Sequence, residues 1–279
     1  MEFLSCWKKR PEHLQTRKLK ISKVDFKFHI IIPARYASTR LPGKPLLEIN
    51  NKSLIQHVYE SACQCGAENI YIATDDSRIK DKAESFGAEV IMTATDHISG
   101  TDRLAEVASI LQLNDEEIIV NLQGDEIGVP AELVHQVANN LNDHPDHRIA
   151  TICERIDNEK DINDPNVVKV VFDQNNTALY FSRATIPYTM KGQEQGHEQR
   201  QSYFKHIGLY AYRVAYLKKF SATPVCDLER CESLEQLRAL YTGEKIYLEE
   251  ACTSAGIGID TEEDLFRARQ QNAHENSGT

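Results

Sequence analysis

The 279-residue sequence predicts an α/β fold with a mixed, mostly parallel sheet flanked by helices and a strand-rich insertion in the second half. In the first half, apolar runs of strand length alternate with helical patterns, which is the rhythm of βαβ units. In the second half, strand-like runs follow one another with few helical patterns between them. Since no linker rich in Pro, Gly and Ser separates the halves, we expect one domain over residues 28–270, between a poorly ordered basic extension (1–27) and a short tail (271–279).

The individual elements are expected from hydrophobic periodicity and from capping and turn residues. In the first half they are a strand ending at Ile32, helices over 53–65, 77–86 and 104–111, and strands over 69–74, 89–92 and 117–122. In the second half they are strands over 150–154, 167–172, 178–182, 205–212 and 245–249, a helix over 233–240, and a last helix that Thr261 and Asp264 would cap. The loop over 191–201, rich in Gly, Gln and Glu, is expected to be mobile.

The composition is that of an ordinary water-soluble protein. Hydrophobic residues make up 41% and charged residues 27% of the chain, which is enough apolar material for a sizeable core. We see no apolar run long enough to cross a bilayer and no apolar core of a secretory signal. The seven cysteines are odd in number and scattered, without a CxxC pair. We therefore expect a reducing cytoplasm and no membrane insertion, disulfide framework or structural zinc.

Charge is spread unevenly along the chain. The net charge is −10, yet residues 1–27 hold eight Lys and Arg against three Asp and Glu, a balance of +5 that leaves −15 for the rest. An acidic body argues against general nucleic-acid binding. The basic segment could touch nucleic acid or anionic lipid, but we favour the poorly ordered extension because periodic patterns start only at Phe28.

The loop after the first strand carries three cations in an otherwise acidic protein: Arg35, Arg40 and Lys44. The same short stretch contains three prolines, which lower the entropy lost when a loop becomes ordered. Guanidinium and ammonium groups suit phosphate oxygens, so the loop could be a polyphosphate cradle at the carboxyl end of a strand. The alternative is a solvated basic turn, since the spacing is not that of the Walker motif.

Two carboxylates are candidates for a metal site. Asp125 and Asp260 each follow an apolar, strand-like run, and two hard carboxylates at one end of a sheet would hold Mg²⁺ together with phosphate oxygens and water. Each residue alone could instead cap a helix. Opposite a loop with three cations, the pair favours the metal site.

Other polar residues have structural alternatives of equal or greater weight. The segment from Ser99 to Arg103 opens a helix, where N–H groups could meet a ligand or Ser99 or Thr101 could act as a plain cap. Four other polar residues are most simply explained by structural roles. They are His206 in a strand, Glu235 and Gln236 in a helix, and Arg183 after a strand. The chain has no GxSxG or HExxH motif, so direct metal-assisted displacement at phosphorus fits better than a covalent intermediate.

Eight segments, in order, resemble those of the 3-deoxy-D-manno-octulosonate (Kdo) cytidylyltransferases, from about Phe28 to Arg269. They are IPARYASTRLPGKPL (32–46), IATDD (72–76), SGTDRLAE (99–106), NLQGDE (121–126), ALYFSRATIPY (178–188), KHIGLYAY (205–212), LEQLR (234–238) and GIDTEEDL (258–265). The resemblance implies a Rossmann-like nucleotidyltransferase fold, usually a homodimer. It implies a Mg²⁺-dependent reaction in which CTP and Kdo give CMP-Kdo and diphosphate for lipopolysaccharide synthesis.

The resemblance also implies roles for individual residues. The catalytic residues would be Arg35, Arg40, Lys44 and Asp125, and the magnesium ligands Asp125 and Asp260. The nucleotide would contact Ala34, Arg35, Ser38, Lys44, Ser99, Thr101, Arg103 and Gln123, whereas the sugar acid would contact Arg183, His206, Tyr210, Glu235 and Gln236.

One departure from the family pattern lies next to Asp125. The family usually continues Pro-Leu after Gln-Gly-Asp-Glu, whereas this chain has Ile127 and Gly128, which we expect to loosen the loop and to affect the sugar more than the metal. Two alternatives therefore stay open: a CMP-sugar synthetase for a related keto-acid sugar such as 8-amino-Kdo, and a non-catalytic nucleotide-binding regulator.

Overall fold

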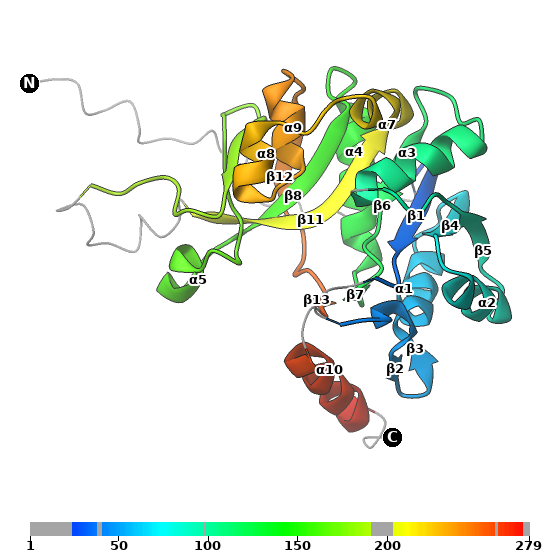
Figure 1. Cartoon of the computed structure of the whole chain (residues 1–279). Helices are drawn as coiled ribbons and strands as arrows, with labels where there is room; N and C mark the ends of the chain where they lie inside the picture. Colours follow the sequence, from blue (N-terminus) through cyan, green and yellow to red (C-terminus); the bar gives the residue numbers. More distant parts are fainter. Residues whose placement is uncertain (1–23, 38–40, 98, 191–202, 260–261, 276–279) are drawn as a thin grey trace, which may run out of the picture.

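The computed structural model describes residues 24–37, 41–97, 99–190, 203–259 and 262–275. In this part of the chain a nine-stranded mixed sheet forms the centre of the molecule, with the strand order β10-β9-β11-β6-β1-β4-β5 and with β8 joining β11 to β12 (Figure 1). The predicted mixed α/β architecture is confirmed.

The parallel half of the sheet consists of four strands from the first half of the chain. They are β1 (Phe28–Ala34), β4 (Asn69–Thr74), β5 (Glu89–Met92) and β6 (Ile118–Asn121). β1 pairs in parallel with β4 on one side and β6 on the other, and β4 pairs in parallel with β5. The carboxyl ends of these strands therefore meet at one edge, as the alternating sequence pattern predicts.

The remaining strands of the sheet come from the second half of the chain. They are β8 (Ile149–Arg155), β9 (Lys169–Phe172), β10 (Ala178–Ser182), β11 (Phe204–Arg213) and β12 (Ile246–Glu250). The long strand β11 runs antiparallel to β6, β8 and β9, so it joins the strand-rich segment to the parallel half. β12 lies parallel to β8.

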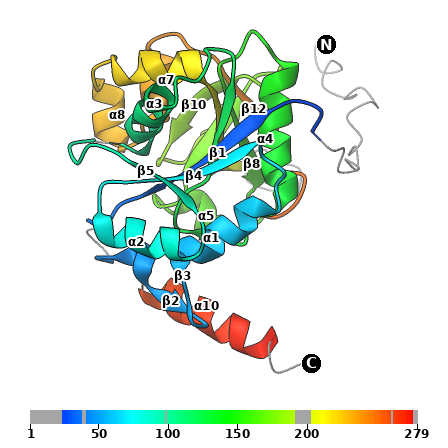
Figure 2. The ribbon, with the colours of Figure 1, turned by 90° about the vertical axis from the view of Figure 1, so that its right-hand side faces the viewer.

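Helices cover both faces of the sheet (Figure 2). One face packs against α1 (Leu54–Cys63), α2 (Ser77–Ser85) and α4 (Ala131–Asp143), and the other against α3 (Gly100–Ile110), α7 (Val214–Ser221) and α9 (Gln236–Tyr241). The remaining helices are α5 (Glu159–Asn163), α8 (Asp227–Glu232), α10 (Glu262–Glu275) and the short 3₁₀ helix η2 (Lys44–Leu46). None of the described helices is long and apolar enough to cross a membrane.

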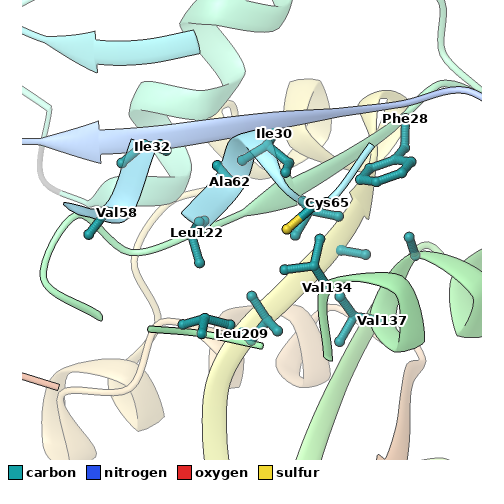
Figure 3. Packing of buried hydrophobic residues seen from close by; sticks show 14 of the residues in the cluster. Phe28, Ile30, Ile32, Val58, Ala62, Cys65, Leu122, Val134, Val137 and Leu209 are labelled. Atoms are coloured by element: carbon teal, nitrogen blue, oxygen red, sulfur yellow. The ribbon is translucent and has the colours of Figure 1, made fainter. Parts of the chain in front are cut away.

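Successive side chains of β1 point to opposite faces of the sheet and belong to two separate hydrophobic cores. Ile30 and Ile32 are fully buried on the face of α1 and α4, where they meet Val58 and Val134 (Figure 3), whereas Ile31 between them is buried on the face of α3. A strand with both faces buried reads as a continuous apolar run, which explains the sequence pattern.

Two small strand pairs lie outside the main sheet. They are β2 (Glu48–Ile49) with β3 (Lys52–Ser53), and β7 (Glu126–Ile127) with β13 (Ile257–Gly258). Near the first pair lies α10, whose Leu265 is buried against Ile49 and Leu54 (Figures 1 and 2).

Some predicted helices differ from those observed. The helix predicted over 233–240 begins later, at Gln236 (α9), because Ser233 adopts a left-handed conformation (φ 52°) that ends the preceding helix α8. The helix predicted from Leu104 already begins at Gly100. The mobile loop predicted over 191–201 and Thr261, the expected cap, lie outside the described residues.

Candidate functional site

The cation loop and the Asp125 loop leave neighbouring strand ends. β1 and β6 are parallel neighbours, and at their carboxyl ends Gly124 lies so close to Pro33 that a Cβ atom on Gly124 would stand 2.7 Å from the Pro33 carbonyl oxygen. Real Cβ atoms do not approach a carbonyl oxygen so closely, so only glycine fits this position. The next residue, Asp125, is therefore held beside the start of the cation loop.

Lys44 and Asp125 form an ion pair across the two loops. The Lys44 Nζ donates to Asp125 Oδ2 at 2.6 Å, with the lysine side chain 9% and the aspartate side chain 37% exposed. Gly43 precedes the lysine in a left-handed conformation (φ 69°), and its N–H donates to the Tyr36 carbonyl at 3.0 Å, which closes the base of the loop. Ser38 and Arg40, between these two points, lie outside the described residues.

The polypeptide that leads to Asp260 also reaches Asp125. β13 pairs with β7, and the Ile259 N–H donates to the Asp125 carbonyl at 3.0 Å. Asp260 itself lies outside the described residues, and the described ranges hold no group of three His, Cys, Asp or Glu arranged as a metal site. A half-exposed carboxylate at the edge of the sheet is the hard donor that magnesium prefers, so Asp125 fits the ion that the resemblance implies.

The departure from the family pattern falls in this strand pair. Gly128 adopts a left-handed φ of 69°, as the substitution by glycine allows, but Ile127 before it is paired with Ile257. Gly256 crosses so closely that an added Cβ would lie 2.5 Å from the Ile127 carbonyl oxygen. The segment behind Asp125 is therefore held by strand pairing, in place of the loosened loop that the sequence suggests.

Two neighbouring arginines, Arg35 in the cation loop and Arg103 in α3, place positive charge where the loop begins. Arg103 is fully buried in α3, where it donates to Asp75 Oδ2 at 2.8 Å and to the Thr93 hydroxyl. Burial, and next the nearby Arg103 guanidinium, lower the pKa of Arg35, which follows the buried Ala34 at the end of β1. Two neighbouring guanidinium groups favour an anionic ligand between them and the strand ends.

The start of α3 links this positive region to a second pocket. Ser99 caps the helix and forms a capping box with Asp102, so the local structural interpretation of Ser99 is confirmed. The hydroxyl of Thr101 donates to Glu235 Oε1 at 2.9 Å, from α3 to the start of α9. Gln123, after β6, is half-buried, and its carbonyl accepts from the Glu126 N–H at 3.2 Å.

Beyond Thr101 lies a small aromatic cavity of about 10 Å³, roughly the space for one water molecule. Its lining includes Thr101, Tyr210, Tyr212, Tyr216, Glu235 and Gln236. Among the described residues, neither Tyr210 Oη nor Glu235 Oε2 has a hydrogen-bond partner, although both atoms are buried. Burial raises the pKa values of Tyr210 and Glu235. Buried polar atoms without partners suit the hydroxyl groups of a polyol ligand.

His206 stands next to Tyr210, with ring centroids 5.2 Å apart. Its Nε2 lies 3.0 Å from the Thr151 hydroxyl, and Phe181 packs edge-on against the imidazole at 5.0 Å. Burial lowers the pKa of His206 to about 3, so the imidazole is neutral near pH 7. A neutral imidazole offers a ligand one acceptor or one donor and carries no charge.

Arg183 has partners within its own chain. Its Nε donates to the Glu232 carbonyl at 2.7 Å and its Nη1 to the Pro165 carbonyl at 3.0 Å. A direct contact with the sugar stays a prediction for this residue. Sequence reasoning missed Asp75, which binds Arg103, and the stacked tyrosines Tyr212 and Tyr216. The alternation of tyrosines at 210 and 212 in a strand was a signal for one face lined with aromatic rings.

Comparisons with known proteins show the family of this chain. A family model described as cytidylyltransferase matches residues 29–246. The 3-deoxy-manno-octulosonate cytidylyltransferase of Hahella chejuensis is 51% identical over 245 residues, which is 87% of this chain and 96% of the relative. The protein of the same name from Thioalkalivibrio sulfidiphilus is 52% identical over 244 residues, which is 87% of this chain and 98% of the relative.

Solved structures show the same fold. The structure of a CMP:2-keto-3-deoxy-manno-octonic acid synthetase complexed with CTP is 42% identical, has a TM-score of 0.81, and the match covers 90% of this chain and 100% of that one. The structure of a cytidylyltransferase from Leptospira borgpetersenii is 18% identical and has a TM-score of 0.56, and the match covers 89% of this chain and 87% of that one. At this identity the likeness shows the fold alone.

Proposed function

This chain belongs to the cytidylyltransferase family, among the 3-deoxy-manno-octulosonate cytidylyltransferases, and we propose that it transfers CMP from CTP to the anomeric 2-hydroxyl of Kdo with release of diphosphate. The observation that carries the proposal is the hydrogen bond between Thr101 and Glu235. It joins a region rich in cations at the strand ends to a cavity lined by hydroxyl and carboxyl groups. A triphosphate and a polyhydroxylated acid could meet at that junction.

In the nucleotide half, positive groups bind and orient the triphosphate. Lys44 and Arg35 approach the phosphates from the cation loop, together with Ser38 and Arg40, which we assign from the resemblance. The start of α3, with Ser99, Thr101 and Arg103, and Gln123 would hold the cytidine. Because Lys44 already pairs with Asp125, binding of a triphosphate gives the ammonium group a second anion and draws the two loops together.

A magnesium ion would be held by Asp125 and Asp260, with phosphate oxygens and water completing its coordination. When bound, the ion would neutralise charge on the α-phosphate and the leaving diphosphate. Ile259, bonded to the Asp125 backbone, supports this pairing because it brings the chain to the aspartate one residue before Asp260. The described part of this arrangement is the position of Asp125, which follows β6 at the edge of the sheet.

In the sugar half, polar groups in and beside the aromatic cavity would contact the acceptor, and the cavity would have to widen, because it has space for about one water molecule. Glu235 and Gln236 at the start of α9, with His206 and Tyr210 on β11, provide hydrogen-bonding groups for the sugar hydroxyls. Their burial excludes water from the attacking hydroxyl, which limits hydrolysis of CTP. The 2-hydroxyl then attacks the α-phosphorus in line, its bond to phosphorus forms as the bond to diphosphate breaks, and its proton passes to solvent or to a neighbouring base.

We place this activity in the cytoplasm, where nucleoside triphosphates are available, as a homodimer that activates Kdo for lipopolysaccharide synthesis. A diphosphate-release assay tests the substrates: each of the four nucleoside triphosphates is combined with Kdo or 8-amino-Kdo in the presence of magnesium. We expect release only with CTP and at the highest kcat/KM with Kdo. Release with the amino analogue alone would transfer the proposal to that sugar, and CTP binding without turnover would favour the non-catalytic regulator.

A further inference from the structure

Lys169 is a lysine with a fully buried side chain at the start of β9. Its Nζ donates to the carbonyl oxygens of Asp164 (2.7 Å), Val167 (2.6 Å) and Arg183 (2.7 Å). An ammonium group has three N–H donors, so all of them are used. Because burying a charge is costly unless it is fully hydrogen-bonded, this arrangement binds two chain segments firmly around one cation.

The second segment continues the network to α8. The carboxylate of Glu232 accepts from the Arg183 N–H at 2.8 Å and from the Ser182 hydroxyl at 2.6 Å, while Arg183 Nε donates to the Glu232 carbonyl at 2.7 Å. Both backbone groups of Arg183 are therefore hydrogen-bonded to charged side chains: its carbonyl accepts from Lys169, and its N–H donates to Glu232. The end of β10 cannot move without breaking charge-assisted bonds.

One branch of the network leads to Glu235. Glu232 is the last residue of α8, and the left-handed Ser233 turns the chain into α9, at whose start Glu235 faces Thr101. Arg238 locks α9 to α8 through two bonds to the Glu229 carboxylate, at 2.6 and 2.7 Å. The two helices therefore form one unit, and the position of Glu232 sets that of the Glu235 carboxylate.

The other branch leads to His206. The carbonyl of Val168, the neighbour of Lys169, accepts a hydrogen bond from the backbone N–H of His206 at 2.8 Å. Phe181, two residues before Arg183, packs edge-on against the His206 imidazole. Both protein segments held by Lys169 therefore also contact His206.

We propose that Lys169 is a positioning residue for the acceptor sugar: through Arg183 and Glu232 it sets the distance between His206 and Glu235, and so the affinity of the cavity for a sugar acid, without touching the substrate. This inference rests on the proposed function of the cavity. The network reaches the nucleotide half only at its end, through the hydrogen bond from Thr101 to Glu235, and Lys44 and Arg103 have no hydrogen bond to Lys169, Arg183 or Glu232 among the described contacts. A change at Lys169 should therefore affect the sugar more than the nucleotide, which makes the two halves separable by experiment.

The test replaces Lys169 by methionine (Lys169→Met), an unbranched side chain of similar shape that lacks the charge and the three donors. We expect KM for Kdo to rise at least tenfold while KM for CTP stays within twofold, and amide hydrogen exchange over residues 233–241 to accelerate while exchange over 41–47 is unchanged. Lys218→Met, on the surface of α7, is the matched control and should leave both constants unchanged.

Unchanged KM for Kdo in Lys169→Met, even with a lower melting temperature, would show a purely structural lysine and overturn the proposal. Equal rises in both KM values would also overturn it. If Lys169→Met does not fold, Glu232→Gln takes its place, with a smaller rise in KM for Kdo expected and an unchanged value contradicting the inference. Absence of turnover of Kdo by the unmodified enzyme would refute the proposed function, whereas the hydrogen-exchange comparison would still decide whether Lys169 holds residues 233–241.

Discussion

His206 makes the stability of the protein depend on pH in a calculable way. The pKa of its imidazole is lowered to about 3 by burial, whereas an unfolded histidine titrates near pH 6.5. Between these values the unfolded chain binds one more proton than the folded chain, so the free energy of unfolding falls as the pH falls. Of the two pH units between pH 7 and pH 5, about 1.5 lie below the pKa of the unfolded histidine. Each of these pH units lowers the free energy of unfolding by about 1.36 kcal/mol, so the total loss is about 2 kcal/mol.

The perturbation that isolates this effect is His206→Gln, because glutamine keeps a hydrogen-bonding group near the Thr151 hydroxyl and does not titrate. Urea unfolding of both proteins at pH 7 and pH 5 gives the assay. Between pH 7 and pH 5 the free energy of unfolding of the unmodified protein should fall by about 2 kcal/mol more than that of the variant. This difference does not depend on how much the substitution destabilises the protein at pH 7. An equal loss in both proteins would refute the reasoning, since it would mean that His206 titrates alike in the folded and unfolded chains.

Three further substitutions test the contacts that build the site. Gly124→Ala should destabilise the protein by about 1–3 kcal/mol in urea unfolding and lower kcat/KM for CTP, because the new Cβ meets the Pro33 carbonyl oxygen at 2.7 Å. Arg238→Met leaves the Glu229 carboxylate buried without its partner, and should cost about 3–5 kcal/mol in the same measurement. Lys44→Met should lower kcat/KM for CTP about 100-fold with little change in melting temperature.

Each of these substitutions has a matched control in the chain. Gly258→Ala adds a Cβ that meets nothing within 4 Å, so a loss equal to that of Gly124→Ala would contradict the contact argument. Arg230→Met breaks an exposed ion pair and should cost less than about 1 kcal/mol, against the buried pair of Arg238. Lys52→Met removes an exposed lysine, and a comparable fall in kcat/KM there would contradict a specific role of Lys44.

Strand positions in the parallel half could be predicted closely from the sequence. The strands predicted over 69–74 and 89–92 coincide with β4 and β5, because each apolar run is bounded by polar or glycine-containing turns. The expectation that polar residues after β1 and β6 converge also follows from the parallel pairing of these two strands. It accounts for the contact between Lys44 and Asp125, which are 81 positions apart.

Other features depend on tertiary contacts that local patterns do not contain. The late start of the predicted helix, at Gln236, follows from Ser233, a left-handed residue that is not glycine and that ends α8. Contacts of Glu232 and Arg238 to neighbouring elements support this turn. The partners of Arg183 lie at 165 and 232, so its local surroundings in the sequence could not reveal them. α4, which packs its buried residues against β6, β8 and β11, was not predicted because its pattern lacks a side-chain N-cap.

We propose that this chain transfers CMP from CTP to Kdo beside the junction of Thr101 and Glu235. Phosphorus NMR of the unmodified enzyme with CTP, Kdo and magnesium tests the transfer most directly, since it follows both products in one sample. We expect one phosphodiester signal of CMP-Kdo to appear for every diphosphate released, with no accumulation of CMP. Diphosphate with free CMP and without the sugar nucleotide would contradict the claim, because it would show hydrolysis of CTP in place of transfer to the sugar.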